Sequence, residues 1–246
     1  MAQKLLAQGI EDATLTLTNT TSSSDGRQLK NRDARVNSID EASGSSTIQI
    51  EVDYAVSTTV DYILLGNLNT DADITISFYR WNGASYDLVA SESADTYTNA
   101  NHFFTFSSAT ATQFRIDLNP STSAAIELSY IIMGVDYDLP VSYQVPANLD
   151  SYIKGRVELD AHGYPYGENI NTARKKIWEI EYRLTDTQLD TLRTNLAYAW
   201  YNQRPFVWYD TEVDTTYRLV RLDQEDVPGE HIAINYKRVP LRLVEL

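Results

Sequence analysis

The side chains that most often carry catalysis are few and scattered in this sequence. It has no cysteine and only three histidines, His102, His162 and His231, and no two of these stand at the spacing of a metal site. None of the motifs that position a catalytic serine, a zinc ion or a nucleotide phosphate is present. The sequence therefore predicts a protein that is not an enzyme and that holds no metal ion or cofactor.

Carboxylates are numerous, and pairs of them perform the acid–base chemistry of glycosidases. Asp71 and Asp73 are close in sequence, as are Asp210, Glu212 and Asp214. A solvated turn in an acidic protein is the simpler interpretation of both groups, and a calcium loop is the alternative. Two catalytic carboxylates are defined by their separation in space, so their number alone does not predict a glycan-cleaving site.

Aromatic side chains flank the strongest hairpin signal in the chain, Asn82-Gly83. Trp81 and Tyr86 stand on either side of this signal, and Tyr79 is nearby. An exposed ring at the tip of a β-sandwich can stack on a sugar, which makes Trp81 and Tyr86 candidate glycan contacts. Cross-strand pairing of the rings, which would stabilise the hairpin, is the alternative.

The sequence contains one basic cluster, Arg174, Lys175 and Lys176, just before an aromatic stretch. A solvated entry into a strand is one interpretation of this cluster. The other is a contact between subunits, in which the cluster faces Asp186 and Asp190 of a neighbouring copy.

The formal net charge of the 246-residue chain is −14, and most of it lies in the first part. Residues 1–150 contain 19 Asp and Glu against 7 Lys and Arg, whereas residues 151–246 are nearly neutral and hold three of the four tryptophans. An acidic surface repels phosphate backbones, so nucleic-acid binding is not expected. No run of about 18 apolar residues exists, so membrane insertion is not expected either. The contrast predicts two domains with different roles.

The elements that must position these side chains are mostly strands. Residues 14–18, 48–52 and 74–79 alternate between apolar and polar types, as strands with one buried face do. The apolar run 62–65 predicts a strand buried on both faces, which Gly66-Asn67 ends. Turn signals every 8–15 residues, without an amphipathic helix, predict an antiparallel β-sandwich.

A domain boundary is predicted where Pro140 and Pro146 bracket an extended stretch. It separates a β-sandwich, residues 1–140, from a second β-domain, residues 150–246. The second domain is predicted to contain one helix, residues 185–202, packed on its sheet.

The spacing of Leu189, Leu192 and Leu196 gives this helix one apolar stripe. Thr185 with Gln188 three positions later forms a capping box, which predicts where the helix begins. The chain is therefore predicted to be mainly β, with a single packed α-helix.

The first half resembles galactose-binding-like, discoidin-type sandwiches. The resemblance rests on Ile-Gln-Ile-Glu-Val at residues 48–52, on Val-Asp-Tyr-Ile-Leu-Leu-Gly-Asn-Leu at residues 60–68, on Phe-Arg-Ile-Asp-Leu at residues 114–118 and on residues 131–134. It implies a jelly-roll sandwich, a fold found at the start of many tail-tip proteins of tailed phages.

Residues 174–210 resemble the β-domains of phage distal-tail and tail-adaptor proteins. There, too, a basic turn and an aromatic strand precede a helix, and a short aromatic strand such as residues 204–210 follows it. The resemblance implies a structural component of the virion tail, synthesised in the host cytoplasm. Copies of the chain would form a ring, a hexamer or a trimer, through residues 150–246. The ring would join the tail tube to tail-tip or hub proteins, with the sandwich facing outward.

A carbohydrate-binding module that recognises a host-surface glycan is the alternative function. It would account for the sandwich and for Trp81 and Tyr86, but not for the second domain.

Overall fold

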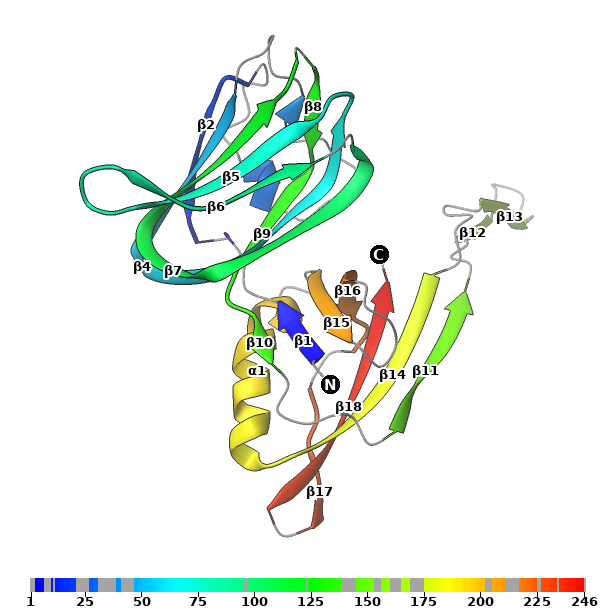
Figure 1. Ribbon diagram of the computed structural model, residues 1–246. Helices are drawn as coiled ribbons and strands as arrows, with labels where there is room; N and C mark the ends of the chain where they lie inside the picture. Colours follow the sequence, from blue (N-terminus) through cyan, green and yellow to red (C-terminus); the bar gives the residue numbers. More distant parts are fainter. Residues whose placement is uncertain are drawn as a thin grey trace. The chain divides into compact units, whose positions relative to one another are not determined.

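The computed structural model describes residues 3–6, 10, 12–20, 27–30, 39–40, 47–94, 97–122, 124–138, 145–152, 156–159, 165–168, 175–201, 205–210, 217–224, 227–233 and 235–245. The chain forms two compact units, Gln8–Asp136 and a second made of Met1–Ala7 with Tyr137–Leu246. Both are built mainly from antiparallel strands, and the second carries the one α-helix of the described residues (Figure 1). The predicted fold class is confirmed.

The unit Gln8–Asp136 is a β-sandwich built around two long, bent strands. Its elements are β2 (Thr14–Thr18), the 3₁₀ helix η1 (Arg27–Lys30), β3 (Ile39–Asp40), β4 (Ile48–Thr70), β5 (Ile74–Trp81), β6 (Tyr86–Ala94), β7 (Tyr97–Pro120), β8 (Ile126–Leu128) and β9 (Tyr130–Gly134). Strands β4 and β7 pair antiparallel over most of their length, and both curve strongly in Figure 1.

The bend in β4 coincides with a break in its pairing to β7 between Asp53 and Thr58. Before the break, β4 and β7 belong to a layer with β2, β5 and β6; after it, β4 pairs with β8 and β9. Register irregularities of this kind bend a strand and increase its twist. The two layers enclose one apolar core, which includes Ile50, Phe78 and Phe114 from the first and Ile63 from the second, all fully buried.

A second irregularity lies at Gly66-Asn67, where the sequence predicted the end of a strand. The strand β4 instead continues to Thr70, because Asn67 adopts a left-handed conformation with φ of 55° and the pairing shifts by a bulge. A Cβ on Gly66 would lie 2.0 Å from the Tyr130 ring, so only glycine allows that ring to cover the bulge. The Asn67 side chain donates a hydrogen bond to Ser129 Oγ at 2.9 Å.

The second unit is one large antiparallel sheet with a helix on one face. Its elements are β1 (Gln3–Leu6), β10 (Tyr137–Asp138), β11 (Val145–Tyr152), β12 (Arg156–Leu159), β13 (Pro165–Glu168), β14 (Lys175–Leu184), α1 (Asp186–Tyr201), β15 (Phe206–Asp210), β16 (Tyr217–Leu222), β17 (Glu230–Ala233) and β18 (Tyr236–Glu245). The sheet order is β10-β1-β15-β16-β18-β14-β11, with β17 beside β18 and with β12 and β13 as a separate hairpin.

The first strand corrects the predicted domain assignment. The sequence predicts a sandwich over residues 1–140, but β1 pairs with β10 and β15 in the other unit. A four-residue strand carries no local signal of which distant strand it will join, so alternation alone could not place it. Because Leu5 lies opposite Tyr137 in the β1–β10 pair, the sandwich is an insertion between two neighbouring strands of one sheet.

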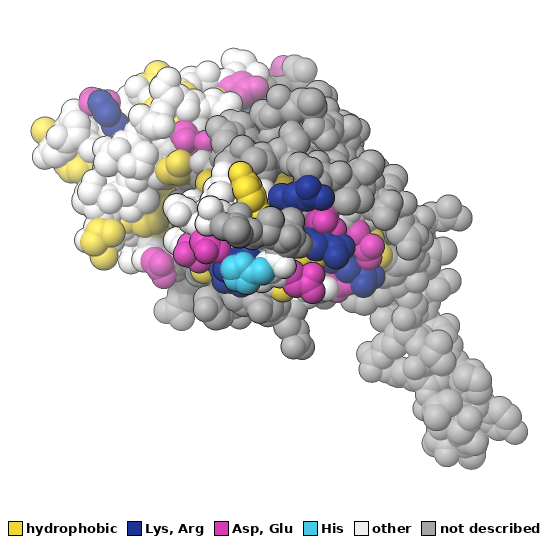
Figure 2. All heavy atoms as spheres, turned by 90° about the horizontal axis from the view of Figure 1, so that it is seen from below, with side chains coloured by type: hydrophobic (Ala, Val, Ile, Leu, Met, Phe, Trp, Pro, Cys, Tyr) yellow, Lys and Arg dark blue, Asp and Glu magenta, His cyan; other side chains and the backbone are white. Residues whose placement is uncertain are grey.

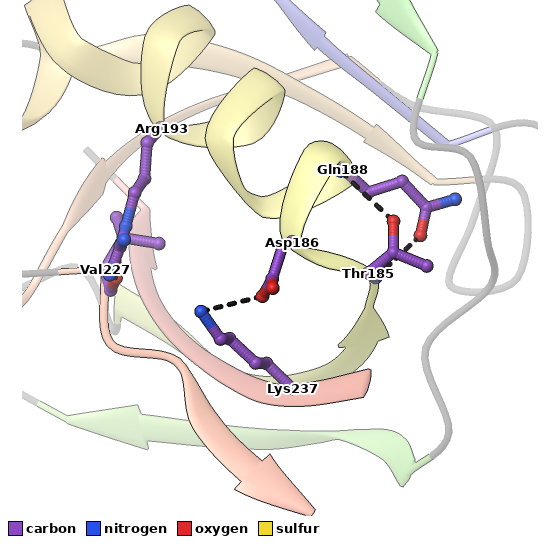
Figure 3. Close-up of polar contacts among 6 residues, drawn as sticks. All are labelled: Thr185, Asp186, Gln188, Arg193, Val227 and Lys237. Atoms are coloured by element: carbon purple, nitrogen blue, oxygen red, sulfur yellow. Dashed lines mark hydrogen bonds and ion pairs between the residues drawn. The ribbon is translucent and has the colours of Figure 1, made fainter. Parts of the chain in front are cut away.

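The helix α1 begins at the predicted capping box (Figure 3). The Thr185 N–H donates to Gln188 Oε1 at 2.9 Å, and the Gln188 N–H donates to Thr185 Oγ1 at 3.3 Å. This reciprocal pair satisfies two backbone donors that a helix start leaves without partners. The observed helix, Asp186–Tyr201, agrees with the predicted range of 185–202 to within one residue at each end.

The predicted leucine stripe packs the helix on the sheet. Leu189, Leu192 and Leu196 are at most 1% exposed and share a core with Trp178 and Trp208, whose rings meet edge to face at 5.2 Å. A polar contact adds to this packing on the same helix, where the guanidinium of Arg193 donates two hydrogen bonds to the Val227 carbonyl (Figure 3).

We predict that Leu196→Ala lowers the free energy of unfolding of the second unit by about 2–5 kcal/mol, because it leaves a cavity in a closed core. Urea denaturation followed by tryptophan fluorescence measures this, since three of the four tryptophans belong to that unit. Thr194→Ala, at an exposed position of the same helix, is the matched control. Equal midpoints for the two variants would show that the stripe is not a core contact.

We also predict that the second unit folds without the sandwich. Replacing residues 8–136 with a turn of about four Gly and Ser residues would join β1 directly to its neighbour β10. The shortened chain should keep a cooperative unfolding transition and dispersed amide NMR signals. A shortened chain without these properties would contradict the insertion architecture.

Candidate functional site

The β5–β6 hairpin confirms the turn that the sequence predicted, and its loop is held by one side chain. Asn82 Oδ1 accepts hydrogen bonds from the backbone N–H groups of Ala84 and Ser85, each at 2.9 Å. The Asn82 Nδ2 donates to Asp87 Oδ1 at 2.8 Å, and Gly83 takes the positive φ of 101° that the turn requires. The turn therefore fixes the hairpin next to Trp81 and Tyr86, the two candidate aromatic residues.

Trp81 and Tyr86 lie opposite each other across this hairpin, with ring centroids 5.1 Å apart and planes at 64°. The cross-strand aromatic pair that the sequence analysis gave as the alternative is therefore present. Both rings remain partly exposed. The pairing thus orients the rings on the outward face of the sheet without covering them.

A guanidinium that the sequence analysis did not select lies between two tyrosines beside this pair. The Arg115 Cζ is 4.5 Å from the Tyr79 ring centroid and 4.7 Å from the Tyr86 ring centroid. The sheet register explains this contact, because Arg115 of β7 lies opposite Tyr79 of β5. Two cation–π contacts therefore hold the guanidinium beside both rings.

Carboxylates complete the same outward face. The Arg115 Nε lies 3.0 Å from Asp117 Oδ1, and Glu51 lies opposite Arg115 on β4. Burial raises the pKa of Asp117 above its usual range, although the Arg115 charge opposes this shift. Burial also raises the pKa of Tyr86, and so do the charge of Glu51 and a hydrogen bond to it. The polar groups on this face are therefore bonded to one another.

One further side chain, Leu88, extends this surface, which we call the aromatic face: Trp81, Tyr86, Tyr79, Arg115 and Leu88. Leu88 lies opposite Tyr79 on β6 and is 58% exposed, far more than a leucine in a sandwich core. The alternation in residues 114–118 already places Arg115 and Asp117 on one side of a strand. The alternation does not show which strands lie beside them, so their neighbours required the structure.

The predicted contact between subunits is only partly described. Arg174 lies outside the described residues. Lys175 and Lys176 are the first residues of β14 and lie opposite β11, but their side chains are also outside the described part of the chain. Asp186 is paired within its own unit, because its Oδ1 lies 2.7 Å from Lys237 Nζ (Figure 3). Asp190 is exposed on the helix. A contact between copies remains a prediction.

Two of the three histidines lie among the described residues. His102 is largely buried beside Glu92, with burial lowering its pKa, and His231 is exposed on β17, whereas His162 lies outside the described residues. Among the described residues, no group of three or more His, Asp or Glu side chains could hold a metal ion.

Of the two acidic groups in the sequence, only Asp71 and Asp73 have described side chains. Both are exposed. Glu212, Asp214 and the side chain of Asp210 lie outside the described residues. Among the residues that the structure describes, no helix has both the length and the apolar character that a membrane span requires.

Charged side chains of both signs alternate on the second unit. Arg238 Nη2 is 2.7 Å from Glu181 Oε2, and Arg242 Nε is 3.4 Å from Asp223 Oδ2. Glu181, Arg238 and Arg242 border a hollow of about 340 Å³ over β14 and β18. Figure 2 shows acidic and basic side chains intermixed on one side of the molecule. Because the charged residues of the hollow pair with residues of opposite sign, they do not form a patch of one sign.

Among known proteins, similarity to this chain is found in solved structures. No family model and no curated protein matches the chain. A chitosan-binding module from Paenibacillus sp. IK-5 is 18% identical over 52% of this chain and 99% of the module, with a TM-score of 0.42. The family 32 carbohydrate-binding module of NanJ from C. perfringens, solved with galactose, is 13% identical over 55% of this chain and 99% of the module, with a TM-score of 0.43.

A Ruminococcus gnavus fucosidase solved with fucose is 14% identical over 53% of this chain and 27% of its own length, with a TM-score of 0.41. These ligands belong to the solved proteins, and none is assigned to this chain by the similarity. The predicted phage-tail role receives no support from these structures.

We predict that Asp186→Asn lowers the thermal midpoint of the second unit at pH 7. The hydrogen bond to Lys237 lowers the pKa of the Asp186 carboxyl from its ordinary 3.8, so the carboxylate stabilises the fold above that pH. The stabilisation is lost as the pH falls through the lower folded-state pKa, so the two midpoints should converge in acid. Asp190→Asn, another exposed carboxylate of the same helix, is the control. A difference that persists unchanged below pH 3.8 would contradict the ion pair.

Proposed function

We propose that the sandwich binds a glycan on its aromatic face. The observation that carries this proposal is the fixed cluster in which Trp81 and Tyr86 pair at 5.1 Å while Arg115 lies between Tyr86 and Tyr79. A sugar ring has an apolar face that stacks on aromatic rings and a rim of hydroxyl groups that need hydrogen-bond partners. The aromatic face offers both kinds of group side by side.

The surface is organised before any ligand arrives. The turn side chain of Asn82 fixes the hairpin, and the contacts of Arg115 fix the tyrosines. A ligand that binds ordered side chains loses less conformational entropy on binding than one that must order them. The partly exposed rings and Leu88, which is 58% exposed, form an apolar surface. The outward face of a sheet with only a structural role would carry polar side chains instead.

We propose binding without cleavage. The carboxylates near the rings are already engaged: Asp117 with Arg115, Glu51 with the Tyr86 hydroxyl, and Asp53 with Gln113 at 3.0 Å. A glycosidase needs one carboxyl group to donate a proton and a second to act across the scissile bond. Carboxylates that hold a cation and an amide in place serve the architecture of the face.

A second proposal concerns the rest of the chain: a structural component of a phage tail that assembles as a ring and displays the sandwich. The observation that favours it is the insertion of the sandwich between β1 and β10 of a unit with its own core. A unit of this kind can assemble with copies of itself and with tail-tube and hub proteins while the inserted module binds a ligand. Electron microscopy of the purified chain tests it, and a monomer at all concentrations would count against the ring.

We predict that Trp81→Ala strongly weakens binding to immobilised oligosaccharides, because it removes the apolar surface on which a sugar would stack and also the aromatic pair with Tyr86, which is itself worth about 0.5–1.5 kcal/mol beyond the area that it buries. Screening the wild-type chain on a glycan array identifies the ligand, and calorimetry then measures the loss. Tyr236→Ala, which removes a 49% exposed ring from the other unit, is the matched control and should bind as the wild type does. Equal binding by Trp81→Ala and wild type would place the ligand elsewhere.

A further inference from the structure

We propose that the aromatic face selects neutral glycans over anionic ones and that Arg115 is the donor that recognises their hydroxyl groups. This inference rests on the proposed glycan binding. It follows from how the guanidinium is held and from the charges that share its face.

The guanidinium of Arg115 is held by two rings and one carboxylate. Its Cζ lies 4.5 Å from the Tyr79 ring centroid and 4.7 Å from that of Tyr86, and its Nε is paired with Asp117. The two Nη groups are the remaining donors, and the Arg115 side chain keeps 21% exposure, enough for a ligand to reach it. A planar fork of N–H donors fits two neighbouring oxygens, which vicinal sugar hydroxyls provide.

The charge of Arg115 is already balanced, which excludes its use as a counter-ion for an acidic sugar. Asp117 lies 3.0 Å away, and Glu51 is the residue directly across the sheet. Asp53 adds a third carboxylate to the outward side of the same layer. Three carboxylates against one guanidinium leave this face with a negative charge.

The whole module carries the same sign. Residues 8–136 contain 17 Asp and Glu against 6 Lys and Arg. A uronic acid or a phosphorylated sugar would therefore approach a negative potential and would place its charge near Glu51 and Asp53. A neutral sugar can stack on Trp81 and accept from Arg115 without that repulsion.

The test compares matched oligosaccharides on the full-length chain: neutral hexose oligomers and uronic acid oligomers of equal length and linkage. We expect the neutral ligand to bind at least about tenfold more tightly at low salt, with a smaller ratio at high salt, where charges are screened. Uronic acid oligomers that bind as tightly as the neutral ones, with binding lost in Trp81→Ala, would overturn this inference and leave the glycan site intact. Binding of neither class would overturn the proposed function itself.

Two variants test the residues. Arg115→Lys keeps the charge but loses the planar fork, so neutral-sugar affinity should fall about tenfold, whereas Arg80→Lys, at an exposed position of β5, should have no effect. Asp53→Asn removes an exposed charge and should raise the affinity for uronic acid oligomers while leaving neutral binding unchanged. This second variant keeps the inference testable if Arg115→Lys fails to fold, and an unchanged affinity ratio in it would contradict the electrostatic selection.

Discussion

The pairing of β4 with β7 is the constraint on which the sandwich depends. These two strands contribute to both layers, and they carry most of the core that holds the layers together. Their register puts Glu51 opposite Arg115, and the pairing of β7 with β5 then puts Arg115 opposite Tyr79. A slip of one residue would turn Arg115 and Asp117 into the core and Ile116 outward, at the cost of burying two charges. The same force that packs the core therefore also assembles the aromatic face.

Burial and hydrogen bonding act against each other on this face. Asp117 is 8% exposed, which raises its pKa and disfavours its charge, yet the ion pair with Arg115 favours it. The tyrosines that stack on Arg115 in turn shield it from water. Aromatic rings and a carboxylate hold the guanidinium of Arg115 in place. Its N–H groups therefore point in fixed directions, whereas those of a freely moving surface arginine do not.

The local patterns of the sequence predicted what depends on neighbours along the chain. The strand Thr14–Thr18, the Asn82 hairpin and the capping box of α1 all appear as the alternation, the turn residues and the cap indicated. The structure differs from the prediction where contacts between distant segments of the chain determine the fold. The bulge at Gly66 and Asn67 carries β4 past its predicted end, and the Tyr130 ring occupies the space that a side chain at residue 66 would need. The sequence pointed to Trp81 and Tyr86 but not to Arg115, because their proximity depends on the pairing of three strands.

The insertion of the sandwich joins it to the second unit at one pair of neighbouring strands. The chain enters the sandwich after β1 and returns at β10, and these neighbouring strands lie in one sheet. At the return, the Asp136 N–H donates to Asp61 Oδ1 at 3.0 Å, so the last residue of the sandwich is tied to β4, the strand that also carries Glu51. Each unit has an apolar core of its own among the described residues. The residues that assemble the aromatic face are therefore held by one core, and those that pack α1 on its sheet are held by the other.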